Sequence, residues 1–120
     1  SIRAYDEAIR LDPGYAAAWN GKAAALLPPG RYGESLVASE EAIRLDPDLS
    51  QAWNNKGSAL GELGRNEEAL LSFEEAIRLD AGYVKAWINK GMCLQSLGRM
   101  DEAGQAFAKA NELQKVEAKA

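Results

Sequence analysis

Hydrophobic residues along the chain recur every three or four positions, a spacing typical of amphipathic α-helices. Within residues 50–65 one apolar face comprises Trp53, Gly57, Leu60 and Gly61, and Gly64 follows as a helix end. Within residues 66–80 a second apolar stripe comprises Ala69, Phe73, Ala76, Ile77 and Leu79. Glutamates and Arg78 lie on the opposite side of this second stretch. The pattern predicts two amphipathic helices joined by a turn.

The same helix pair recurs every 34 residues, as the spacing of Trp19, Trp53 and Trp87 shows. The stretch "AWNNKGSALGELGR" at 52–65 returns as "AWINKGMCLQSLGR" at 86–99 and, more loosely, as "AWNGKAAALLPPGR" at 18–31. Neither helix of one pair can bury its whole apolar surface alone, whereas stacked pairs can. The repeat therefore predicts a helical solenoid with an inner, concave face.

We expect one all-α domain over residues 1–120, with about seven antiparallel-paired helices in a superhelix. Its parts are the second helix of a truncated repeat at 1–15, repeat 1 at 16–49, repeat 2 at 50–83, and repeat 3 at 84–120 with an extended C-terminal capping helix. The opening half-repeat indicates a fragment of a longer solenoid. Asn111 stands where Ile9, Ile43 and Ile77 stand in the other copies, and this polar replacement is typical of a capping helix.

Repeat 1 departs from the pattern at Pro28, Pro29 and Ser39. Two prolines cannot lie inside a helix, so we expect its first helix to end near Leu26 or Leu27 and the turn to lengthen. The change has two alternative explanations: it widens the groove, or it is neutral sequence variation that a repeat array tolerates.

Composition then limits the chemistry. The chain carries 14 basic and 18 acidic residues, a net charge of −4, with both signs interspersed, so we expect neither nucleic acid nor a membrane as a partner. A single cysteine, Cys93, and no histidine exclude an internal disulfide, Cys/His zinc sites and Ser-His or Cys-His catalytic pairs. We expect no catalysis, metal or cofactor. The sequence shows no transmembrane run or leader pattern, and a cytoplasmic location fits it best.

The 34-residue unit resembles the tetratricopeptide repeat (TPR). Numbered from Ser50 and Val84, repeats 2 and 3 carry the Trp, Gly, Leu, Ala, Phe and Ala of that pattern at Trp53, Gly57, Leu60, Ala69, Phe73 and Ala76, and at Trp87, Gly91, Leu94, Ala103, Phe107 and Ala110. The resemblance spans nearly the whole chain. It implies an αα-superhelix whose concave surface, lined by the first helix of each repeat, binds a protein or peptide.

By this resemblance the candidate peptide-binding residues are Asn20, Gln51, Asn54, Asn55, Ser58, Lys85, Asn89 and Met92. Asn55 and Asn89 occupy one position in successive repeats and resemble the start of an asparagine ladder that holds a peptide backbone. The alternative is that these amides only solvate an exposed helix face. Of the two-carboxylate clamp found in chaperone-binding members, only Asn55 and Lys85 match, so we do not expect an acidic peptide tail to bind.

Two further features have simpler explanations. We expect the recurring Lys22, Lys56 and Lys90 to form ion pairs with Asp12, Asp46 and Asp80 of neighbouring units. We expect Cys93 to be a small buried thiol.

The leading functional hypothesis is a protein-interaction module whose groove binds an extended peptide or a partner helix. One alternative is a scaffold segment that self-associates through the exposed N-terminal face of Tyr5, Ile9 and Leu11. Another is a region that positions substrates for a larger enzyme.

Overall fold

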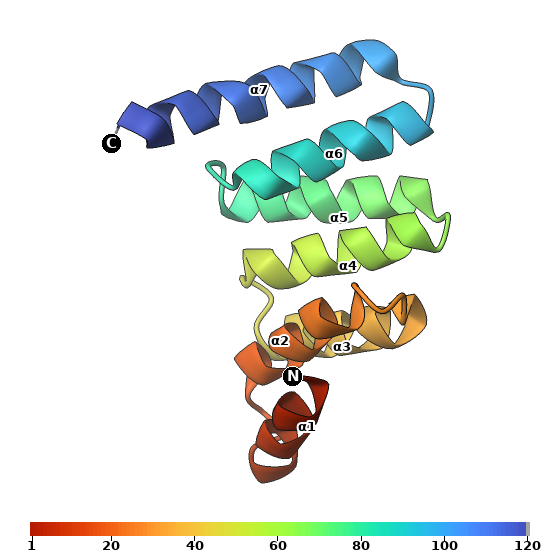
Figure 1. Ribbon diagram of the computed structural model, residues 1–120, viewed down its shortest axis with the longest axis vertical. Helices are drawn as coiled ribbons and strands as arrows, with labels where there is room; N and C mark the ends of the chain where they lie inside the picture. Colours follow the sequence, from red (N-terminus) through yellow and green to blue (C-terminus); the bar gives the residue numbers. More distant parts are fainter. Residues whose placement is uncertain (120) are drawn as a thin grey trace.

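The computed structural model describes the backbone of residues 1–119 and the side chains of residues 1–118, and within this part it contains seven α-helices and no strand. The helices are α1 (Ile2–Leu11), α2 (Ala16–Leu26), α3 (Tyr32–Leu45), α4 (Ser50–Glu62), α5 (Asn66–Leu79), α6 (Val84–Ser96) and α7 (Met100–Lys119). Figure 1 shows them stacked in chain order, in a body of 45 × 35 × 23 Å. The fold is the all-α solenoid that the sequence predicts.

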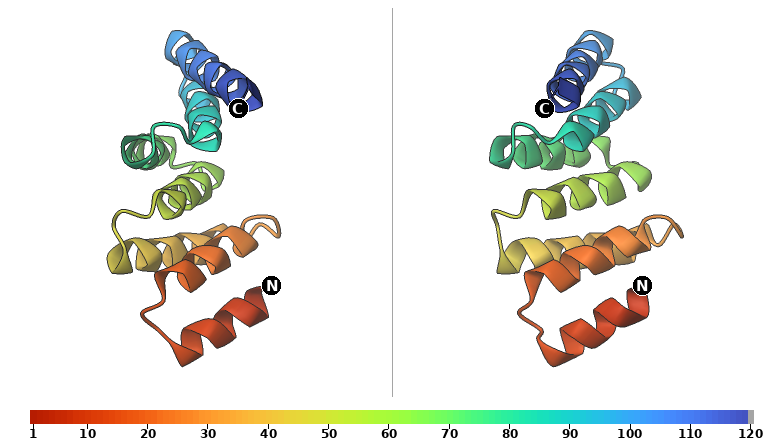
Figure 2. Two further views of the ribbon diagram at one scale, coloured as in Figure 1. Left: turned by 90° about the vertical axis from the view of Figure 1, so that its left-hand side faces the viewer. Right: turned by 60° about the vertical axis from the view of Figure 1, so that its left-hand side comes forward.

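Helices pair within repeats and also contact the next repeat. The pairs α2–α3, α4–α5 and α6–α7 pack together, and α3 and α5 also pack on α4 and α6 (Figure 2). In addition α2 contacts α4, and α4 contacts α6, whereas no two of α1, α3, α5 and α7 contact each other within residues 1–119. Because first helices of successive repeats contact each other and second helices do not, the first helices form the inner face of the stack and the second helices form the outer face.

A large ring packs against a glycine inside each regular repeat. A Cβ atom on Gly57 would lie 2.6 Å from the ring of Phe73, and one on Gly91 would lie 2.6 Å from the ring of Phe107. The absence of a side chain therefore lets the two helices approach closely.

Repeat 1 solves the same packing problem differently. It has Ala23 and Ser39 where the other repeats have glycine and phenylalanine, and both residues are fully buried. The Ser39 hydroxyl donates to the carbonyl of Leu36 over 2.9 Å, and the Ser35 hydroxyl donates to the carbonyl of Ala23 over 2.7 Å. The buried serines are thus satisfied within the repeat.

The turn inside each repeat needs a glycine with positive φ, at Gly30 (82°), Gly64 (80°) and Gly98 (76°). Helix α2 ends at Leu26, two positions earlier in register than α4 and α6, as Pro28 and Pro29 require. The longer turn still closes with a hydrogen bond from the Arg31 N–H to the Leu26 carbonyl at 3.0 Å, equivalent to Arg65 to Leu60 at 2.9 Å. This conserved closure explains why the 34-residue register survives the two prolines.

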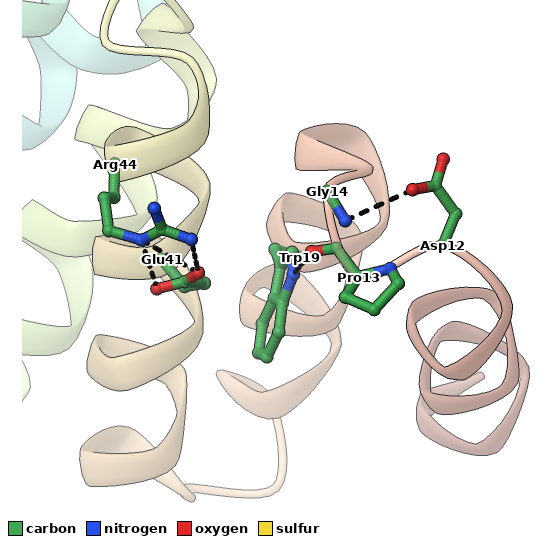
Figure 3. Close-up of polar contacts among 6 residues, drawn as sticks. All are labelled: Asp12, Pro13, Gly14, Trp19, Glu41 and Arg44. Atoms are coloured by element: carbon green, nitrogen blue, oxygen red, sulfur yellow. Dashed lines mark hydrogen bonds and ion pairs between the residues drawn. The ribbon is translucent and has the colours of Figure 1, made fainter.

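The linkers between repeats are held by one aspartate and one tryptophan (Figure 3). The carboxylate of Asp12 accepts from the N–H of Gly14 at 3.2 Å, and Asp46 and Asp80 accept in the same way from Asp48 and Gly82. The Trp19 indole N–H donates to the Pro13 carbonyl at 2.9 Å, and Trp53 and Trp87 make the equivalent bonds to Pro47 and Ala81. Figure 3 also shows Arg44 paired with Glu41 on the neighbouring helix α3.

The expected pairing of the recurring lysines with these aspartates is wrong. Lys22 pairs with Asp6 at 2.7 Å, Lys56 with Glu40 at 3.6 Å and Lys90 with Glu74 at 3.5 Å. Each lysine also lies over the ring of the tryptophan one turn earlier, with its nitrogen 5.9, 5.4 and 5.4 Å from the ring centres. The aspartates do not meet these lysines because their carboxylates hold the linker backbone instead.

Candidate functional site

All of the candidate residues lie on the helices of the inner face. Asn20 is on α2, Gln51, Asn54, Asn55 and Ser58 are on α4, and Lys85, Asn89 and Met92 are on α6. Gln51, Lys85 and Met92 are exposed, and Asn20, Asn55, Ser58 and Asn89 are half-buried. The side chains that remain accessible combine neutral amides with one lysine and one thioether.

The asparagines form pairs across the repeat boundaries. The Asn55 amide donates to the Asn20 side-chain oxygen over 2.7 Å, and the Asn89 amide donates to the Asn54 side-chain oxygen over 3.0 Å. The two residues of each pair are 35 apart, one more than the repeat length. A residue of one repeat therefore bonds to the residue one position further along in the next repeat. Because Asn55 and Asn89 each bond to the preceding repeat, the amides are aligned by the stacking itself. The recurrence of Asn at a spacing of 35 was the sequence signal for these pairs.

Asn54 differs from its expected place in the groove. Its side chain is only 2% exposed, because Asn89 covers it from the next repeat. Asn54 also forms a hydrogen bond with Tyr83. Burial raises the pKa of Tyr83, and this hydrogen bond opposes the rise. Asn54 therefore belongs to the contact between repeats 2 and 3 and presents no free amide to a ligand.

A hollow of about 130 Å³ opens on the inner face between α4 and α6. It brings together three candidate residues, Ser58, Asn89 and Met92. Seven other residues line the hollow and were not predicted as site residues from the sequence: Gly57, Gly61, Glu62, Asn66, Phe73, Cys93 and Ser96. The glycines of α4 leave the space open, and their spacing of four was the signal available in the sequence.

Cys93 is buried in this hollow, as expected, and is 6% exposed. Its thiol donates to the Asn66 carbonyl over 3.1 Å. Burial is the main cause that raises the pKa of the Cys93 thiol, and the carboxylate of Glu67 adds to the rise. A protonated, hydrogen-bonded thiol is a packing group and a poor nucleophile.

Charge is sparse on the inner face. Lys85 lies in the first turn of α6, and Glu62 is the last residue of α4; both are exposed. Neither takes part in an ion pair among residues 1–118. Because α4 and α6 run in the same direction (Figure 1), these two charges lie at opposite edges of the inner face.

The outer face has a hollow in each repeat, at the same place each time. The volumes are about 440 Å³ beside Trp19, about 430 Å³ beside Trp53 and about 360 Å³ beside Trp87. Each contains the lysine that is already paired with a carboxylate of the preceding helix. Leu71 lines the middle one and is 68% exposed.

Two further features of the described residues bear on function. Across the described helices, none is long and apolar enough to cross a membrane. The described residues also contain no group of three or more His, Cys, Asp or Glu side chains that could hold a metal ion.

Comparisons with known proteins agree with this architecture. The family model of the tetratricopeptide repeat matches residues 1–50, 30–84 and 54–114. A crystal structure of MamA is 24% identical with a TM-score of 0.88, over 99% of this chain and 70% of that one. MamA 41-end from Desulfovibrio magneticus RS-1 is 23% identical with a TM-score of 0.85, over 96% and 65%.

A third structure contains a ligand. The second TPR of Spaghetti (RPAP3), bound to the HSP90 peptide SRMEEVD, is 26% identical with a TM-score of 0.78, over 82% of this chain and 91% of that one. The curated protein sequences contain no match. The overlapping matches of the family model cover the chain from residue 1 to residue 114, and the chain therefore belongs to the tetratricopeptide repeat family.

Proposed function

We propose that this protein is a non-catalytic interaction module that binds an extended peptide across its inner face. The observation that carries the proposal is the row of half-buried asparagine amides next to an open hollow on α4 and α6. The structure of a similar domain, the second TPR of RPAP3, with a bound peptide supports it.

The asparagine pairs suit a peptide backbone physically. A primary amide has two N–H donors and an acceptor oxygen. In the pairs described above, Asn55 and Asn89 each use one N–H, and their other N–H and their oxygen are left to bond the N–H and C=O groups of an extended chain. Holding the amides by contacts between repeats also lowers the entropy that a ligand must remove on binding.

The test compares two exposed apolar residues on opposite faces. Met92 is 53% exposed in the groove, and Leu71 is 68% exposed on the outer face. We expect Met92→Arg to abolish binding of peptides selected from a random display library, and Leu71→Arg to leave it unchanged, as measured by fluorescence anisotropy. Equal binding by both variants, or a loss caused by Leu71→Arg alone, would place the ligand elsewhere.

A second candidate function is self-association through α1. Among the described helices α1 packs against α2 alone, it has no buried residue, and Leu11 is 70% exposed. Sedimentation equilibrium between micromolar and millimolar concentrations tests this candidate. A mass that rises with concentration in the wild type and stays at 13.0 kDa in Leu11→Glu supports it, and a constant 13.0 kDa in both rejects it.

A further inference from the structure

The hollow between α4 and α6 has both polar and apolar walls, and the apolar part lies on all three lining helices α4, α5 and α6. The ring of Phe73, the thioether of Met92 and the bare backbone of Gly57 and Gly61 line it. A cavity of about 150 Å³ in another protein is large enough to bind benzene. At about 130 Å³ this hollow has room for one aliphatic side chain.

Three polar groups of the lining already have partners inside the protein. The Cys93 thiol donates to Asn66, the Asn89 amide donates to Asn54, and the Ser96 hydroxyl donates to the Met92 carbonyl over 3.2 Å. A polar side chain placed against these three groups would lose its water and find few new partners among them. The part of the hollow lined by Cys93, the Phe73 ring and Met92 therefore favours an apolar occupant.

The edge of the hollow is negatively charged. Glu62 lines it, and Glu67 follows Asn66, another lining residue, at the start of α5. Neither carboxylate takes part in an ion pair within the described chain. The nearby Arg99 is occupied by Glu102, which accepts from its guanidinium at 3.0 and 2.8 Å.

The inner face offers little to balance these carboxylates. Lys22, Lys56 and Lys90 lie in the outer-face hollows and are paired with Asp6, Glu40 and Glu74, and Lys85 lies at the opposite edge of the inner face. An acidic peptide such as SRMEEVD, which the RPAP3 domain binds, would meet like charge beside the hollow.

We propose that the hollow holds one aliphatic side chain of the bound peptide and that Glu62 and Glu67 select a lysine or arginine next to it. This inference rests on the proposed function and specifies its ligand: an extended segment in which an aliphatic residue adjoins a basic one. The aliphatic residue supplies the apolar contact, and the basic residue supplies charge complementarity at the edge.

The experiment begins with peptides selected by the wild-type protein from a random display library. Three variants are then measured by anisotropy: Glu62→Lys combined with Glu67→Lys, Gly61→Leu to fill the hollow, and Met92→Arg to block the groove. Gly61 lines the hollow, and a Cβ there meets its nearest atoms only at 3.9 Å, so a side chain can start at this position without overlap. Gly104→Leu, where nothing lies within 4 Å, and Glu117→Lys on α7 are the matched controls.

We expect selected peptides to share an aliphatic–basic pair. The double reversal should weaken their binding by roughly tenfold or more and favour acidic versions of the same peptides, because two attractive contacts become repulsive. Gly61→Leu should weaken binding similarly, and both controls should bind as the wild type does. Circular dichroism melting identifies any variant that fails to fold. Glu62→Gln then replaces the double charge reversal, and Gly61→Ala replaces Gly61→Leu. Both replacements should also weaken peptide binding.

Two results overturn the inference in different ways. In the first, Met92→Arg abolishes binding of the selected peptides, but neither the charge reversal nor Gly61→Leu weakens it. This result would reject the anchor site while the proposed function stands. A wild-type protein that enriches no peptide at all would reject the proposed function together with the inference.

Discussion

The side-chain amide of Asn89 donates to the side-chain oxygen of Asn54 over 3.0 Å, and Asn54 is 2% exposed at the boundary between repeats 2 and 3. Asn20 and Asn55 make the equivalent bond between repeats 1 and 2 at 2.7 Å. The groove surface and the contact between repeats therefore share the same residues. A change that alters ligand binding at these positions also alters how the repeats stack.

Asn54→Ala should destabilise the fold more than Asn20→Ala. Asn54 is 2% exposed and bonds to both Asn89 and Tyr83, so removing its amide breaks two hydrogen bonds at a buried position, at a cost of about 1–3 kcal/mol. Asn20 is half-buried, so water replaces its bond to Asn55 at lower cost. Urea denaturation followed by circular dichroism measures both free energies of unfolding. Equal losses would mean that burial of Asn54 adds nothing to the contact.

Gly57→Ala should destabilise the protein, whereas Gly104→Ala should stabilise it. The new Cβ at position 57 would lie 2.6 Å from the Phe73 ring, and such overpacking costs about 1–3 kcal/mol. Gly104 lies in α7 with nothing within 4 Å of an added Cβ, so alanine gains about 0.5–1 kcal/mol of helix propensity. Thermal melting of the two variants gives the comparison. A tolerated Gly57→Ala would show that the α4–α5 contact is less tight than the structure indicates.

Lys56→Met should change stability by less than about 1 kcal/mol, although Lys56 contacts both Glu40 and the Trp53 ring. The ion pair is partly exposed, and the methionine side chain keeps the apolar contact with the ring. Unfolding in urea at low and high salt measures the difference between wild type and variant, which should shrink as salt screens the pair. A large loss that is insensitive to salt would contradict this assignment.

Stability should fall as the pH rises above about 8.5, where an unfolded cysteine loses its proton. Burial raises the pKa of Cys93 in the folded state, so over this range the unfolded chain binds fewer protons than the folded one. The contribution is fully present below the unfolded pKa and is lost as the pH rises through the folded pKa. Cys93→Ala should flatten this part of the profile. Tyr83→Phe should act only at higher pH, because the pKa of Tyr83 is also raised by burial.

Local sequence rules were sufficient for the helices and for their departures from regularity. The period of 34 residues predicted the stacked pairs. Pro28 and Pro29 predicted that α2 ends near Leu26 or Leu27, and it ends at Leu26, because proline acts on its own helix. Burial of Cys93 followed from its position among apolar neighbours. These properties depend on residues within one repeat.

Contacts between repeats were beyond the sequence. Three findings join residues of different helices or repeats: Lys56 pairs with Glu40, Asn54 is buried beneath Asn89, and Glu62 and Met92 line one hollow. Which of these residues lie opposite one another depends on the rotation and offset between successive helix pairs. The packing of rings and small residues sets that geometry. The sequence alone therefore determined the repeat and its helices. Only the tertiary structure decided which amides, charges and apolar groups meet on the inner face.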